Sequence, residues 1–135
     1  MREILFRGVS KESGKMVFGF LSVSKMGNYK IIYQFEDYKW NDEDVIPETV
    51  GEFTGLLDKN GVKIFEGDIV IYWNGKGVVE RGFFELSQNN GFPCWCVAKY
   101  AINGKKRTGR YKPIRVDHEV IGNRWDNPEL LEEPK

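Results

Sequence analysis

The chain has 135 residues, and 20 lysines and arginines stand against 20 aspartates and glutamates, so its formal net charge is zero. Hydrophobic residues make up 41% and charged residues 30%, a composition that indicates a folded domain and excludes a disordered tail or a collagen-like repeat. The balance of charge also excludes a uniformly basic nucleic-acid coat.

Short runs of β-branched and aromatic residues alternate with turn residues along most of the chain. The predicted strands, in chain order, are residues 4–8, 16–23, 29–35, 53–57, 62–65, 69–73, 78–86 and 94–102. Gly19 lies inside the second run and predicts a bulge or a close backbone approach. Strands at this spacing are typical of small barrels and sandwiches, so the sequence predicts an all-β fold.

The connections between these runs carry distinct signals. The strongest is Asp58-Lys59-Asn60-Gly61, in which Asn-Gly supplies a positive φ and Asp58 can accept hydrogen bonds from the local backbone. Residues 41–44 predict a solvated acidic loop, residues 74–77 a hairpin turn and residues 87–91 a loop. Two helical turns are also expected, one at residues 47–51 with proline first, and one that begins after Asn127 as its N-cap.

Residue types that carry chemistry are few. Cys94 and Cys96 are predicted to share one face of a strand as buried or half-buried free thiols, because zinc would need more ligands than the chain offers. His118 stands between two acids, but neighbours in a strand point to opposite faces, so a surface histidine is favoured over a catalytic one. The sequence therefore predicts no metal, no cofactor and no catalytic residue.

Charge is segregated along the chain. Residues 36–52 hold seven acids and one base, whereas residues 99–115 hold seven bases and no acid. A basic segment interleaved with tyrosines can follow a phosphate backbone and stack on bases, and an acidic partner protein would use the same charges. The alternative is a solvated basic hairpin that balances the acidic stretch. The predicted binding residues are Lys105, Lys106, Arg107, Arg110, Tyr111, Lys112 and Arg115.

Three separate stretches resemble one protein family. They are residues 45–70 (VIPETVGEFTGLLDKNGVKIFEGDIV), the opening residues 2–8 with 18–21, and residues 119–123 with 125–131. Together they resemble the YopX family of small phage and prophage proteins. The resemblance implies an all-β fold with an intertwined N-terminal β part and a small SH3-like barrel. The resemblance also implies that the protein is encoded by an accessory gene of a phage or prophage, and it identifies no catalytic residue.

These observations define the expected organisation and function. The chain is expected to be one compact unit, 1–135, made of an N-terminal β part (1–57), a barrel part (58–125) and a C-terminal helix and tail (126–135) that does not fold independently. No run is long enough for an export signal or a membrane span, so a cytoplasmic location is expected. The expected function is a non-enzymatic binding module that contacts protein or nucleic acid. The alternatives are a self-associating homo-oligomer and an enzyme of unknown class.

Overall fold

The computed structural model of the protein consists mostly of β-strands, which confirms the predicted all-β class. It describes residues 3–34, 36, 38–72, 75–87, 90–99, 112–114 and 117–131, and for residues 82–87, 90–93, 99, 112 and 113 the backbone alone. The chain divides into two compact units, Met1–Gly55 and Leu56–Lys135. The folding of the parts 1–57, 58–125 and 126–135 as one unit stays a prediction.

The first unit is an antiparallel sheet with five strands and one short helix. Its elements are β1 (Phe6–Val9), β2 (Met16–Val23), β3 (Tyr29–Gln34), β4 (Trp40–Asp44), the 3₁₀ helix η1 (Pro47–Thr49) and β5 (Gly51–Leu57), whose last residues already belong to the second unit. Within this unit the strand order is β4-β3-β2-β1-β5. The predicted helical turn is confirmed, and the hydroxyl of Thr49 accepts a hydrogen bond from the backbone N–H of Val9 at 2.9 Å.

Strand β4 corrects the prediction of a solvated acidic loop at residues 41–44. It pairs with β3 over all its residues, with Asp44 opposite Lys30. The hydroxyl of Tyr33 donates a hydrogen bond to a carboxylate oxygen of Glu43 at 2.7 Å. Acidic residues are depleted in strands, so the local pattern favoured a loop, and the pairing with β3 decided otherwise. Charges on an outer strand also discourage pairing with the edges of other sheets.

The interior of the first unit explains one feature of the sequence. Its buried apolar side chains include Ile31 and Val45, which have no exposed surface, and Phe53. Gly19 of β2 lies against β3 so closely that a Cβ atom at this position would overlap the backbone oxygen of Ile32. The predicted close backbone approach at Gly19 is therefore confirmed, and it lets β2 pair with both of its neighbours.

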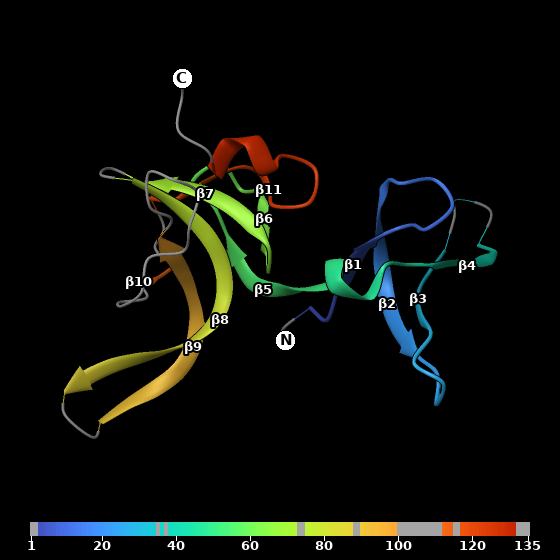
Figure 1. The fold of residues 1–135 in the computed structure, drawn as a ribbon, viewed down its shortest axis with the longest axis horizontal. Coiled ribbons are helices and arrows are strands. Elements are labelled where there is room, and N and C mark those ends of the chain that lie inside the picture. Colours follow the sequence, from blue (N-terminus) through green and yellow to red (C-terminus); the bar gives the residue numbers. More distant parts are fainter. Residues whose placement is uncertain are drawn as a thin grey trace. The chain divides into compact units, whose positions relative to one another are not determined.

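The second unit contains an antiparallel sheet with the strand order β10-β9-β8-β7-β11. Its elements are β6 (Lys63–Phe65), β7 (Asp68–Tyr72), β8 (Gly75–Ser87), β9 (Asn90–Lys99), β10 (Lys112–Pro113), β11 (Glu119–Asn123) and the 3₁₀ helix η2 (Pro128–Leu131). The hairpin of β8 and β9 reaches well beyond the other strands of this sheet (Figure 1). The intertwining and the SH3-like barrel that the resemblance implies stay predictions.

The long hairpin corrects two predicted connections. Residues 75–77 belong to β8 rather than to a turn, because Gly75 already pairs with Tyr72. In the predicted loop at 87–91, residues 87, 90 and 91 belong to strands, and Ser87 pairs with Asn90 after a register shift. Residues 88 and 89 of this prediction lie outside the described residues. The hydrophobic core of this unit contains the buried side chains of Ile64, Val70, Val79 and Val97. The half-buried side chains of Tyr72, Trp95, Ile114 and Val120 pack against it.

The Asp58–Gly61 turn has the predicted geometry and also makes a contact that the sequence did not indicate. Gly61 has a φ of 81°, the left-handed conformation expected of Asn-Gly. One carboxylate oxygen of Asp58, Oδ1, accepts hydrogen bonds from the backbone N–H groups of Asn60 and Val62 at 2.8 and 2.9 Å. The other, Oδ2, accepts from Val120 of β11 at 3.0 Å. The turn is thus fixed to a strand about 60 residues away along the chain.

The C-terminal turn is confirmed as a short helix with a modified cap. The backbone carbonyl of Asn127 accepts a hydrogen bond from Leu130, as expected of an N-cap residue. Its side-chain oxygen, however, accepts from the backbone N–H of Asn123 at 3.2 Å instead of from the helix. No helix among the described residues is long and apolar enough to cross a membrane.

Candidate interaction surface

Only a small part of the basic segment 99–115, which is predicted to bind a partner, lies among the described residues. Lys112 lies in β10, where its backbone pairs with Val97 of β9. The other predicted binding residues lie outside the described residues: Lys105, Lys106, Arg107, Arg110, Tyr111 and Arg115. The contact of segment 99–115 with nucleic acid or protein therefore stays a prediction.

Asp58 is buried, and its carboxylate oxygens accept hydrogen bonds from backbone N–H groups of the second unit. Burial alone would raise the pKa of this carboxyl group, but the backbone N–H groups of Val120, Val62 and Asn60 and the charge of Lys59 outweigh it, and the pKa is lowered. The group is ionised at neutral pH and receives three backbone hydrogen bonds. Its role is to join the turn to β11.

His118 is buried, which corrects the prediction of a surface histidine. Its side chain is 2% exposed, and its ring centroid lies 5.1 Å from that of Tyr72. The cause is the pairing of β11 with β7, in which Glu119 lies opposite Ile71. His118, the residue before Glu119, therefore lies beside the end of β7. The histidine is a packing element of the second unit, and its backbone carbonyl accepts a hydrogen bond from Lys59 at 3.0 Å.

The two cysteines are free thiols on one face of β9, as predicted. Their Sγ atoms lie 3.0 Å apart, and Cys94 is half-buried whereas Cys96 is buried. Burial and the neighbouring thiol of Cys94 raise the pKa of Cys96 to about 12. In the part of the chain that the structure describes, no three histidine, cysteine or acidic side chains are grouped as a metal site would require.

The first unit presents three exposed aromatic side chains on one face of its sheet. Phe18 and Phe20 are alternate residues of β2 and therefore point to the same face, where they are 47% and 55% exposed. Trp40 of β4 is 61% exposed, and its ring centroid lies 6.3 Å from that of Phe20 at a tilt of 46°. Ile32 of β3 lies opposite Phe20 of β2 and opposite Asp42 of β4, between these two strands. We call Phe18, Phe20 and Trp40 the aromatic face.

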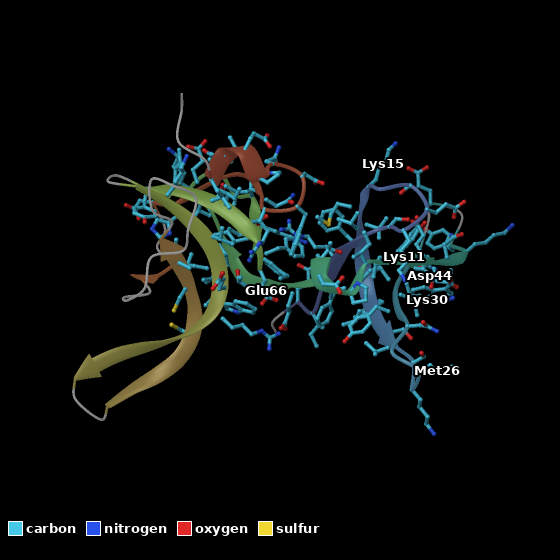
Figure 2. The ribbon with its side chains drawn as sticks, in the orientation of Figure 1. Lys11, Lys15, Met26, Lys30, Asp44 and Glu66 are labelled. Atoms are coloured by element: carbon cyan, nitrogen blue, oxygen red, sulfur yellow. The ribbon has the colours of Figure 1, made fainter. Side chains whose placement is uncertain are left out.

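Charged side chains continue the same face beyond the aromatic rings. Lys30 of β3 and Asp44 of β4 are cross-strand neighbours, and Figure 2 shows them side by side. The ammonium nitrogen of Lys30 lies 3.2 Å from a carboxylate oxygen of Asp42 and 3.9 Å from one of Asp44. With one base against two acids, this end of the face has a charge of 1 − 2 = −1. We call Lys30, Asp42 and Asp44 the charged end.

The aromatic face was not predicted from the sequence, although β2 contains a signal for it. Residues 16–23, MVFGFLSV, are apolar at both alternating sets of positions, whereas a half-buried strand needs only one apolar set. The excess apolar set, which includes Phe18 and Phe20, is the exposed one. Trp40 could not be assigned to this face from the sequence, because residues 41–44 were predicted to form a loop and the direction of Trp40 depends on the pairing of β4 with β3.

The comparison with known protein families agrees with the resemblance. Residues 5–132 match the model of a family described as YopX protein. Among solved structures, the chain is similar to the crystal structure of protein EF1440 from Enterococcus faecalis, with 22% sequence identity and a TM-score of 0.49, over 98% of this chain and 100% of that one. The comparison with curated proteins gave no match.

Proposed function

This chain belongs to the YopX family, and we propose that it is a non-enzymatic binding protein of a phage or prophage that acts in the bacterial cytoplasm by contacting another protein. The observation that carries the proposal is the aromatic face. Half-exposed phenylalanine and tryptophan side chains gathered on one surface are typical of contact sites, because they bury a large apolar area at a small cost in conformational entropy.

The size of the face sets the strength of binding to expect. Three aromatic side chains of about 200 Å² each, about half exposed, offer roughly 300 Å² of apolar surface. At about 25 cal/mol per Å², its burial would contribute about 7.5 kcal/mol. Association itself costs about 4–15 kcal/mol, so the aromatic face alone supports weak binding, and tight binding requires further polar contacts around it.

Affinity capture tests the proposal, with host lysate prepared with and without nuclease. The wild type is compared with Trp40→Ser, which removes the largest ring of the face, and with the control Met26→Ser. Met26 is 89% exposed, and it lies in the turn after β2, outside the aromatic face (Figure 2). A protein retained by the wild type and the control but lost with Trp40→Ser, whether or not nuclease is added, supports the proposal. Equal capture by all three contradicts it.

The basic segment 99–115 favours a second candidate function, contact with nucleic acid. Its seven bases and flanking tyrosines would bind an oligonucleotide in a salt-dependent manner, since binding releases counterions. A nuclease-sensitive capture, or an oligonucleotide shift that weakens as salt rises, would favour this candidate. The absence of a shift at low salt would exclude it.

Two further alternatives are separated by simple measurements. A self-associating homo-oligomer would increase in mass with concentration in light scattering, whereas a monomer at high concentration excludes it. An enzyme of unknown class would need His118 and carboxylates to meet in an accessible site. The burial of the His118 ring against Tyr72 disfavours that alternative.

A further inference from the structure

We propose that the aromatic face and the charged end together bind an extended, cationic polypeptide segment in which an apolar side chain is followed at alternate positions by two basic ones. This inference rests on the proposed function and specifies the partner. Its basis is the order of side chains along β4, where Trp40, Asp42 and Asp44 are alternate residues and therefore point to one face.

The spacing of β4 fixes the conformation of the partner. Alternate residues of a strand lie about 6.8 Å apart, so the ring of Trp40 and the two carboxylates form a row with this spacing. An extended peptide has the same spacing between its own alternate side chains. It can therefore place an apolar side chain on Trp40 and Phe20 and a basic side chain near each carboxylate. The expected pattern is apolar-x-basic-x-basic.

The two carboxylates retain the capacity to bind a second cation. Each ionised carboxylate offers about four lone-pair positions, and one lysine ammonium has three donors. Lys30 lies close to Asp42 but 3.9 Å from Asp44, whose side chain is 60% exposed. The net charge of −1 favours a cationic partner, and the neighbouring rings of Trp40 and Phe20 add attraction for lysine or arginine through their π faces.

The same charges disfavour nucleic acid on this face. Stacking platforms for bases combine aromatic rings with basic side chains that neutralise phosphates. Here the carboxylates of Asp42 and Asp44 lie two and four residues along the strand from Trp40, and they would repel a phosphate chain that crosses the sheet. The aromatic face therefore fits a polypeptide, whatever the basic segment 99–115 binds.

Two fluorescent peptides of identical composition test the spacing. One contains Leu-Ser-Lys-Ser-Lys and the other Leu-Lys-Lys-Ser-Ser, within the same flanking residues. Each is titrated with the full-length protein at low salt, and fluorescence anisotropy is measured. We expect the first peptide to bind about threefold more tightly, because it aligns two lysines with the carboxylates of β4 and the second peptide aligns one, and a single exposed ion pair contributes modestly. Failure of both peptides to bind overturns the inference.

Protein variants separate the inference from the proposed function. Asp42→Asn with Asp44→Asn should remove the difference between the peptides, Trp40→Ser should weaken both, and Met26→Ser should change neither. All these side chains are exposed, and circular dichroism checks that each variant is folded. If Trp40→Ser abolishes capture but the two peptides bind equally, the inference fails and the proposed function survives. If Trp40→Ser changes neither capture nor peptide binding, both fail.

Two other occupants of the face are outcomes of the same experiment. A thymidine oligonucleotide that binds the wild type and not Trp40→Ser would show a nucleic-acid site and overturn the inference. A concentration-dependent dimer that Trp40→Ser converts to a monomer would show that a second copy of the chain covers the face, which also overturns it. A wild type that stays monomeric and binds the correctly spaced peptide supports it.

Discussion

The replacement Asp58→Asn tests how strongly the Asp58–Gly61 turn holds β11. Asparagine keeps one acceptor oxygen but presents an NH₂ group where the carboxylate receives one of its three backbone hydrogen bonds, and it removes the charge. Hydrogen bonds to charged groups contribute about 1.5–3 kcal/mol each. The loss of one such bond and the weakening of the others should lower the free energy of unfolding by about 3 kcal/mol. For a chain of this length, that corresponds to a decrease in Tm of about 10 °C.

The effect should depend on pH in one direction. Because the pKa of Asp58 is lowered in the folded protein, its stabilising contribution is present above the unfolded value of about 3.9 and is lost as the pH falls through the folded pKa. Urea denaturation of the wild type and Asp58→Asn should therefore show a clear difference at pH 7, and this difference should become smaller as the pH falls below about 3.9. Glu129→Gln, which removes an exposed acid of η2, is the control.

Hydrogen exchange locates the effect of Asp58→Asn. The backbone amides of Asn60, Val62 and Val120 should exchange faster in the variant, because each has lost or weakened its carboxylate acceptor. Equal urea midpoints at pH 7, or a difference that is the same at pH 7 and pH 2, would refute the assignment of Asp58 as a charged anchor between the turn and β11.

Two further predictions concern β2 and β9. Gly19→Ala should lower the free energy of unfolding by about 2 kcal/mol or more, because the added methyl group would overlap a backbone oxygen of β3; chemical denaturation measures it, and Ser22→Ala on the same strand should have a much smaller effect. In native protein at pH 8, iodoacetamide should modify Cys94 well before Cys96. Cys96 is buried, and a pKa of about 12 leaves only about 10⁻⁴ of its side chain as thiolate. Mass spectrometry of the peptides measures the two rates, and equal rates would contradict the prediction.

Much of the fold follows from local sequence. The Asp58–Gly61 turn, the proline at the start of η1 and the glycine of β2 each act through conformational preferences that span only a few residues. Runs of β-branched and aromatic residues likewise indicated most of the strands. The same kind of reasoning placed both thiols on one face of β9, since alternation along a strand needs no knowledge of its partners.

What the sequence determined by itself is therefore the all-β class, the Asp58–Gly61 turn, the two helical turns and the membership of the YopX family. Only the tertiary structure decided that the acids of residues 41–44 form an outer strand, that His118 is buried, and that Phe18, Phe20 and Trp40 share one exposed face. Turn geometry depends on neighbouring residues, whereas strand register and burial depend on which segments pair and pack together. The aromatic face depends on how β2, β3 and β4 pair, so it could be identified only once the pairing of these strands was known.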